Sequence, residues 1–301
     1  RFETVDEINS QVAFQYRMEG LLDDLFADED WAETLLFADA IEFKPVQHLT
    51  DIAKALDSNW DLLTPFCCPD LPADDFSDLI TRGHALINQI DGCFGDTSKD
   101  SMVKLLTKVS QVVYSLENAF DVISQLEILH QAVSGTPLLS KNANTKGAKK
   151  NWHDIYSVRS EYAEFRILLK QRHQQFVDAI LNRFLSHLID FTLRSAIDRR
   201  TNGCLEFHDL LVLARNTLRD PLHGSAVRSV LHSKYQRLLL DEFQDTDPIQ
   251  IELAVLIASS PSSDSSRSWQ SLSVEPGRLF FVGDPKQSIY RFRRADIGLF
   301  L

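Results

Sequence analysis

Cysteine is scarce in this sequence, and its four residues lack the spacing of a disulfide framework or a zinc site. Cys67, Cys68, Cys93 and Cys204 form no CxxC pair, and none has a histidine at zinc-finger spacing. Unpaired thiols are typical of reducing compartments. The cysteine pattern therefore excludes a disulfide-stapled secreted domain and predicts a cytoplasmic protein without a metal knuckle.

Long apolar runs are also absent. No stretch approaches the roughly 18 to 20 residues that a membrane-spanning helix needs, and the opening RFETVDEINS lacks the basic-then-apolar order of a signal peptide. The chain starts at Arg1 rather than at methionine, so we expect it to be part of a longer protein. With 44% hydrophobic residues among 301, it is long enough to bury a core, in two lobes rather than one.

An overall excess of positive charge, which is typical of nucleic-acid-binding proteins, is missing too, because the net charge is -12. The charge is unevenly distributed. Residues 1–100 carry 22 acidic and 6 basic groups, a net of -16, whereas residues 101–301 carry 21 and 25, a net of +4. Residues 141–200 alone have a net of +6, from 12 basic and 6 acidic groups. The sequence therefore predicts an acidic lobe beside a mildly basic one.

Residues 1–200 carry the apolar spacing of helices, and no alternating strand is evident in the first 130. Thr50 and Asp51 are the expected caps of one helix, and Asn202 with Gly203 should stop the longest one. Aromatic residues recur along that longest helix at steps of three and four, which predicts that they face a core. The expected helices cover residues 8–28, 50–63, 74–90, 99–133, 152–200 and 205–218.

A loop containing four lysines interrupts these helices at residues 134–152. Its Gly, Pro, Asn and Ser residues favour irregular backbone. Two interpretations stay open: a solvated, mobile surface loop, or a loop whose lysines contact nucleic-acid phosphates regardless of base sequence. The lysines concerned are Lys141, Lys146, Lys149 and Lys150.

The last third of the chain has a strand–helix–strand pattern. RLLLDEF (237–243) and RLFFVGD (278–284) read as short buried strands, and DPIQIELAVLIA between them as a helix capped by Asp247 with Pro248 in its first turn. This order predicts a parallel β–α–β unit. The serine-rich residues 259–277 are expected to be a linker or insertion that is disordered in part.

Two acidic residues follow the first of these strands. Asp241 and Glu242 stand at its carboxyl end, where open parallel sheets bind their ligands. One carboxylate there would help to hold a magnesium ion on nucleotide phosphates, and the other would orient or deprotonate an attacking water. Taken alone the pattern is weak, because an apolar run followed by Asp-Glu is common by chance and helix capping explains Asp247.

The second strand leads into GDPKQSIYRFRRADI (283–297), in which aromatic and guanidinium groups alternate. Rings that stack on bases contribute roughly 1 to 3 kcal/mol each, and arginines bind phosphates, so this pattern is typical of a track for single-stranded nucleic acid. The alternative is that Tyr290 and Phe292 are core residues and the arginines form a solvated edge.

These two stretches resemble a known family. LLLDEFQDTDPIQ is similar to motif II, and FFVGDPKQSIYRFRRADI to motif III, of the UvrD/Rep/PcrA helicases of superfamily 1. The wording GDPKQSIYRF is closer to the AddA and RecB helicase–nuclease subunits, and LEFHDLL (205–211) is similar to a segment upstream of motif II in that branch. The motifs directly cover about 35 residues, and their order and spacing extend the resemblance to residues 200–301.

The resemblance implies roles in ATP hydrolysis for five residues. Asp241 would be the carboxylate on the Mg²⁺ side, and Glu242 would activate water for attack on the γ-phosphate of ATP. Gln287 would sense that phosphate, with Gln244 and Asp245 in the network that joins the two motifs.

The resemblance also implies DNA contacts and a fold. Tyr290 and Phe292 would stack on bases, and Arg293 would contact the backbone. The implied fold is mostly α with a partial α/β part: a large helical accessory (1B-like) subdomain over residues 1–200, joined to a fragment of a P-loop RecA-like parallel sheet over residues 201–301. Single-stranded DNA, duplex DNA at the helical subdomain and a partner subunit of a helicase–nuclease complex are the implied partners.

Three departures from the family pattern qualify these expectations. Arg294 replaces a usual glycine, His208 replaces the first aspartate of the upstream segment, and no GxxxxGK[ST] phosphate loop occurs in the sequence. We therefore expect half of an ATP site, in a fragment without activity of its own, from a 3′ to 5′ DNA helicase. The alternatives are a non-catalytic helical module that binds DNA or a partner, and a helical lobe that only stabilises the fold.

Overall fold

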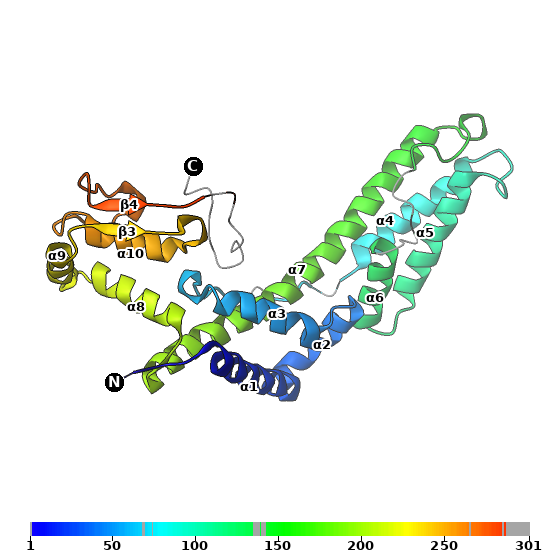
Figure 1. The fold of residues 1–301 in the computed structure, drawn as a ribbon. Helices are drawn as coiled ribbons and strands as arrows, with labels where there is room; N and C mark the ends of the chain where they lie inside the picture. Colours follow the sequence, from blue (N-terminus) through cyan, green and yellow to red (C-terminus); the bar gives the residue numbers. More distant parts are fainter. Residues whose placement is uncertain are drawn as a thin grey trace. The chain divides into compact units, whose positions relative to one another are not determined.

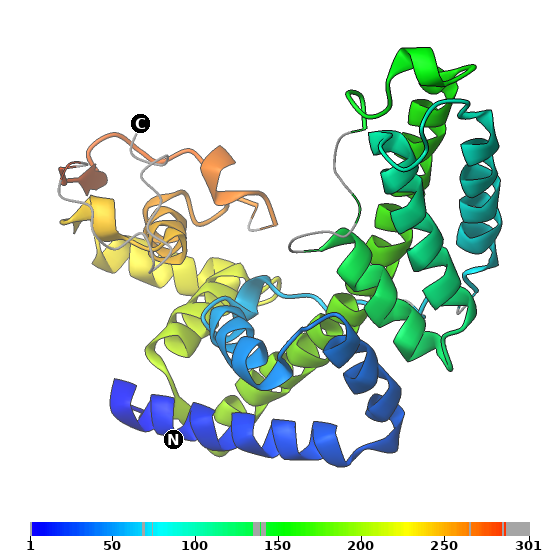
Figure 2. The same cartoon turned by 90° about the vertical axis from the view of Figure 1, so that its right-hand side faces the viewer.

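The computed structural model describes residues 2–67, 70–73, 75–134, 139, 143–264, 266–284 and 286. The chain is mostly helical with a small parallel sheet in its last third (Figures 1 and 2), as predicted. A second parallel pair, β1 (Glu3–Thr4) with β2 (Cys204–Leu205), was not predicted. It divides into two compact units, one formed by Arg1–Phe14 with Arg194–Leu301 and the other by Gln15–Leu193. The first fourteen residues thus join the unit that contains the β–α–β part, whereas the sequence-based boundary at residue 200 assigned them to the helical part.

The unit Gln15–Leu193 contains helices and connecting loops but no strand among its described residues, and its core lies along α7. The aromatic stripe predicted to be core is buried: Phe176 packs against Phe37 and Phe76 at ring distances of 5.8 and 5.6 Å, and Phe184 against Trp31 at 5.3 Å. The helices that lie wholly or partly in this unit are α1 (Glu7–Ala27), α2 (Glu29–Ala40), α3 (Pro45–Asp57), α4 (Ser77–Ile87), α5 (Ser101–Glu117), α6 (Val122–Val133) and α7 (Ile155–Asn202), with short 3-10 turns η1 (Trp60–Leu62), η2 (Asn88–Gly92) and η3 (Lys149–Asn151).

The predicted start of α3 is wrong. The helix begins at Pro45, one turn before the expected caps, so Thr50 and Asp51 lie inside it. Thr50 Oγ1 donates to the carbonyl of Val46 at 3.3 Å, which is the bond of a mid-helix threonine rather than of a cap. Proline fixes φ at a helical value and lacks an N–H that the first turn leaves unused, so Pro45 starts the helix earlier.

The other unit holds both sheets and the predicted β–α–β part. Strand β3 (Leu238–Leu240) pairs in parallel with β4 (Leu279–Phe281) in the register Leu238↔Leu279, and α10 (Pro248–Ala258) connects them and packs against the pair (Figure 1). Asp247 caps α10 by accepting a hydrogen bond from the N–H of Ile249 at 3.0 Å, as predicted. The unit also contains β1 (Glu3–Thr4), β2 (Cys204–Leu205), α8 (Phe207–Arg219), α9 (Gly224–Lys234), η4 (Phe243–Asp245) and η5 (Trp269–Ser271).

The prediction that β3 and β4 are buried is wrong for the described part of the chain. Leu239 is 69% exposed and Phe280 47% exposed. A single helix covers the two strands on one face, where Phe243, Ile251 and Val255 form a small core. A parallel sheet needs helices on both faces to bury its strands, and the described residues supply only one of these layers.

The serine-rich residues 259–277 contain regular structure that we did not expect, namely η5 and an antiparallel bridge between Ser259 and Val274. Across the described residues, no helix combines the length and the apolar character that crossing a bilayer requires.

Candidate functional site

The candidate site starts where β3 ends. Asp241 and Glu242 are exposed there, and the N–H of Glu242 donates to Oδ1 of Asp241 at 3.0 Å. Glu242 has left-handed backbone angles, φ 52° and ψ 42°, at the turn from the strand into η4. This conformation costs a non-glycine residue roughly 1 to 2 kcal/mol and is concentrated at functional sites. The turn stops the strand abruptly and leaves both carboxylates at the sheet edge.

Gln244 joins the ends of the two strands. Its side chain is buried, its Nε2 donates to Oε2 of Glu242 at 2.6 Å, and its Oε1 accepts from the N–H of Asp284 at 2.9 Å. A main-chain bond of 2.9 Å from Phe243 N–H to the carbonyl of Val282 supports the same junction. The carboxylate of Glu242 is therefore connected through one amide to the backbone that follows β4.

Gly283 makes this close approach possible. A Cβ atom at this position would collide with Oε1 of Gln244 and would lie 3.0 Å from the backbone nitrogen of Phe243. Real Cβ contacts are almost never this short, so the Gly-Asp turn of motif III fits against motif II because it carries no side chain here.

Asp245 contributes an unusual carboxylate oxygen. Its Oδ1 is buried and has no hydrogen-bond partner within the part of the chain that the structure describes. Buried polar atoms normally have a partner, so such an atom indicates a missing cation or donor. A second carboxylate, that of Asp241, is exposed at the strand end.

These residues fit a magnesium ion held mainly by a nucleotide. Mg²⁺ is usually bound by one or two carboxylates together with waters and phosphate oxygens rather than by a cage of protein ligands. No group of three or more His, Cys, Asp or Glu side chains in the described ranges is arranged to hold a metal by itself. The carboxylates of Asp241 and Asp245 match the first mode of binding and not the second.

Five predicted site residues lie outside the described residues. They are Gln287, Tyr290, Phe292, Arg293 and Lys141. Their predicted roles therefore stay predictions.

The other three lysines of the predicted loop lie on a segment with a defined path. Asp100, at the start of α5, holds residues 147–151: its Oδ2 accepts from the N–H of Ala148 at 3.2 Å and from Nδ2 of Asn151 at 3.1 Å. Burial alone would raise the pKa of Asp100, but hydrogen bonds from Met102 and from these loop groups lower it below its usual value. An ionised carboxylate thus fixes the loop.

Arg159 fixes the same loop from α7. Its Nε and Nη2 donate to the carbonyl of Lys146 at 2.9 and 2.8 Å. The Nζ of Lys149 lies 5.3 Å from the centre of the exposed Tyr156 ring, and Lys149 and Lys150 are both exposed. The structure thus gathers Lys146, Lys149 and Lys150 on one held segment next to an aromatic ring.

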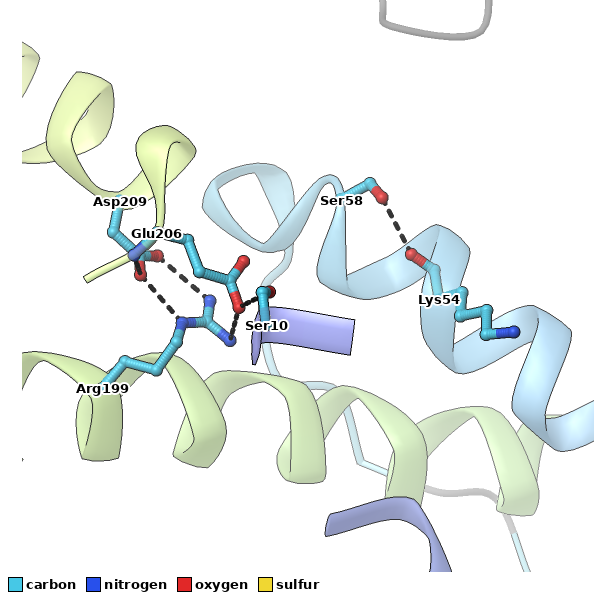
Figure 3. Close-up of polar contacts among 6 residues, drawn as sticks. All are labelled: Ser10, Lys54, Ser58, Arg199, Glu206 and Asp209. Carbon is cyan, nitrogen blue, oxygen red and sulfur yellow. Dashed lines mark hydrogen bonds and ion pairs between the residues drawn. The ribbon is translucent and has the colours of Figure 1, made fainter. Parts of the chain in front are cut away.

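Sequence reasoning missed a buried ion pair at the start of α8 (Figure 3). Arg199 donates through Nε and Nη2 to the two carboxylate oxygens of Asp209, at 2.8 and 3.0 Å, and its Nη1 lies 3.8 Å from Glu206. Ser10 Oγ, from α1, also donates to Glu206 at 2.6 Å. The Glu206-x-x-Asp209 spacing of a capping box was the signal that could have found it.

A parallel β–α–β unit whose strand ends carry Asp-Glu and Gly-Asp, joined by a buried glutamine, is the local structure expected of a nucleotide-dependent motor. The sequence model of the UvrD/REP helicase N-terminal domain matches residues 69–301. The chain belongs to this family.

Comparison with known proteins shows which helicases the chain is similar to. The chain is similar to an ATP-dependent helicase/nuclease subunit of Pediococcus pentosaceus, with 30% identity over 164 residues that make up 53% of this chain and 12% of that protein. The subunits of the same name from Ligilactobacillus salivarius and Bacillus cereus are 34% and 32% identical over 135 residues, which are 44% and 43% of this chain and 9% and 10% of those proteins. The chain spans about a tenth of these relatives. The predicted resemblance to UvrD-like helicases of the AddA branch is confirmed.

Proposed function

We propose that this chain belongs to the motor of an ATP-dependent DNA helicase that works in a helicase–nuclease complex on broken DNA ends, with 3′ to 5′ movement on a single strand. The observation that carries the proposal is the amide of Gln244, which joins the carboxylate of Glu242 to the backbone of Asp284. A motor has to couple its hydrolytic group to its DNA-contacting segment, and motif III begins at this backbone.

In this proposal each described residue of the site has one task. Asp241 would hold Mg²⁺, with Asp245 beside it, and the ion would neutralise phosphate charge when nucleotide is bound. Glu242 would take a proton from the attacking water. Gln244 donates to the Glu242 carboxylate and so fixes its orientation. Gln287 would respond to the γ-phosphate.

DNA contact is proposed for two regions. Tyr290 and Phe292 would stack on the bases of a single strand, and Arg293 would bind its backbone. The helical unit Gln15–Leu193 would act as the accessory subdomain, and Lys146, Lys149 and Lys150 would meet duplex phosphates, with Lys141 on the same loop. The alternative function, a module that docks a partner protein, is favoured by the acidic character of residues 1–100.

The test is DNA-stimulated ATP hydrolysis by the natural protein that contains this chain, compared with its Glu242→Gln variant. Removing a general base lowers the rate by about 10²- to 10⁴-fold, so we expect a loss of this size with nucleotide binding retained. The matched control is Glu275→Gln, which changes an exposed carboxylate paired with Arg278 at 2.9 Å and should leave the rate unchanged. Turnover by Glu242→Gln at the parent rate would contradict the proposal, and capture of a partner by the helical unit in an ATP-inert protein would favour the alternative.

A further inference from the structure

Within the part of the chain that the structure describes, a buried arginine on α9 lacks partners for two of its three nitrogens. Arg228 is 2% exposed, and its Nη2 donates to the carbonyl of Ser263 at 2.9 Å. Its Nε and Nη1 are buried and have no hydrogen-bond partner among the described residues. Leaving the donors of a charged group unpaired inside a protein is costly, so an acceptor is expected at this position.

The charged groups around Arg228 do not supply that acceptor. The Glu252 carboxylate is already engaged in an ion pair with Arg219. Asp264 is exposed and accepts instead from the N–H and Oγ of Ser266, at 2.9 and 2.7 Å. Burial, and then the charge of Arg219, lower the pKa of Arg228, and Asp264 opposes this only in part. The described residues around Arg228 therefore supply too little negative charge for its guanidinium.

Residues 259–264 and 266–268, here called the serine strap, contact this arginine and its neighbours on α8 and α9. Side chains of α8 and α9 hold three of its carbonyls: Ser225 Oγ donates to Pro261 at 3.1 Å, Arg228 to Ser263 at 2.9 Å, and Arg219 to Arg267 at 3.1 Å. Ser263 is only half-buried, and its own carbonyl touches the guanidinium. The Ser263 hydroxyl therefore belongs to the strap residue whose backbone is bonded directly to Arg228.

We infer that the serine strap is a phosphorylation site, in which a phosphate ester on Ser263 is received by the unpaired Nε and Nη1 of Arg228. A separate kinase would transfer the terminal phosphoryl group of a nucleoside triphosphate. The Ser263 Oγ–P bond forms, the bond to the departing nucleoside diphosphate breaks, and the kinase's base takes the hydroxyl proton. The product carries close to two negative charges and three acceptor oxygens, which match the donors left over at Arg228.

The strap is the better source of this anion than the surrounding solution. Nε and Nη1 are covered by protein, which hinders a free anion, whereas an anion on Ser263 would be attached to a residue already bonded to the same guanidinium. The strap also joins α10 to the segment that leads into β4. A phosphate held at Arg228 would therefore fasten the connection between motifs II and III to α9.

The experiment compares the thermal unfolding of the 301-residue chain with and without phosphoserine installed at position 263. We expect the modification to raise Tm by roughly 3 °C, and to raise it little in Arg228→Gln. Phosphoserine at Ser273, an exposed serine further along the same loop, is the matched control and should not raise Tm. A rise that persists in Arg228→Gln, or a fall in Tm in the parent chain, would overturn the inference.

A second measurement needs no arginine variant. In a ³¹P NMR titration, the second pKa of phosphoserine, ordinarily about 6, should fall by about one unit at position 263 and not at position 273. Equal midpoints at the two positions would refute the contact. Inorganic phosphate tests the other source: if it stabilises the parent chain through Arg228 while phosphoserine at 263 does not, the site takes a free anion and the phosphorylation site is wrong.

Discussion

Gly283 and Gly20 show how differently the same substitution acts at two single residues. A Cβ on Gly283 would collide with Gln244, whereas a Cβ on Gly20, in α1, would meet nothing within 4 Å. We expect Gly283→Ala to destabilise the chain by about 1 to 3 kcal/mol through overpacking. We expect Gly20→Ala to stabilise it by about 0.5 to 1 kcal/mol, because alanine favours a helix. Urea unfolding of both variants measures the two effects.

The amide resonance of Asp284 gives a second readout of the residue-scale prediction. If Gly283→Ala pushes Gln244 aside, the N–H of Asp284 loses its acceptor and its chemical shift should move toward that of a solvated amide. An unchanged shift, together with unchanged stability, would mean that the close contact of Gly283 with Gln244 does not hold in solution.

At the scale of elements, one buried ion pair fastens the end of α7 to the start of α8. Asp209 and Arg199 are both nearly inaccessible, so Asp209→Asn leaves a buried guanidinium without its bidentate carboxylate, although Glu206 still lies 3.8 Å from its Nη1. Asp209→Asn should therefore destabilise the chain by roughly 3 kcal/mol in chemical denaturation. Asp198→Asn, which changes an exposed carboxylate one residue from Arg199, should change stability by less than about 0.5 kcal/mol. Equal effects of the two substitutions would show that the pair adds nothing.

Helices α6 and α7 meet at two histidines whose titration should make stability depend on pH. His130 Nδ1 and His173 Nε2 are 2.9 Å apart, and burial, followed by the neighbouring His130, lowers the pKa of His173 from 6.5 to about 4. Between these values the unfolded chain binds more protons than the folded one, so stability is lost as pH falls from 6.5 towards 4. Urea unfolding should show a loss of about 2 kcal/mol between pH 7 and pH 5.

The control for this pH effect is a pair of histidine variants. His173→Gln removes the buried group and should flatten the pH dependence, whereas His153→Gln removes an exposed histidine of the same unit and should leave it intact. If the two variants keep the same slope as the parent chain, His173 is not the group responsible.

Elements with strong local signals were predictable, and those that depend on neighbours were not. The burial of the regularly spaced aromatic residues of α7 and the start of α10 at Asp247-Pro248 follow from the local sequence. Both predictions were confirmed. The start of α3 was missed because Pro45 outweighed the later capping residues Thr50 and Asp51. The exposure of β3 was missed because burial depends on layers that other segments must supply.

For the whole molecule, the sequence lacks a GxxxxGK[ST] loop, so a triphosphate would meet carboxylates without the amide groups and lysine that neutralise its charge. We expect the purified 301-residue chain to hydrolyse ATP no faster than its Glu242→Gln variant, with or without single-stranded DNA. A coupled ATPase assay checks this. Turnover by the parent chain that is lost in Glu242→Gln would show that the described residues form a working site.

The candidate site, like the fold, was predictable from the sequence only in part. Asp241 and Glu242 could be placed at a strand end from the β–α–β order alone, because that order fixes where strand ends lie. The left-handed turn at Glu242, the unpaired oxygen of Asp245 and the contact between Gly283 and Gln244 depend on three-dimensional packing between residues that are 40 positions apart, such as Gln244 and Asp284.

The amide of Gln244 has a consequence for what can replace it. Its two ends differ: the NH₂ faces an acceptor, Glu242, and the oxygen faces a donor, the N–H of Asp284. Turning the amide over would set donor against donor and oxygen against carboxylate, so its orientation is dictated by its neighbours. Glutamate has the length but repels Glu242, asparagine has the groups but lacks the reach, and methionine has neither hydrogen-bonding end. Of these four residues, glutamine alone can therefore bridge the ends of the two strands.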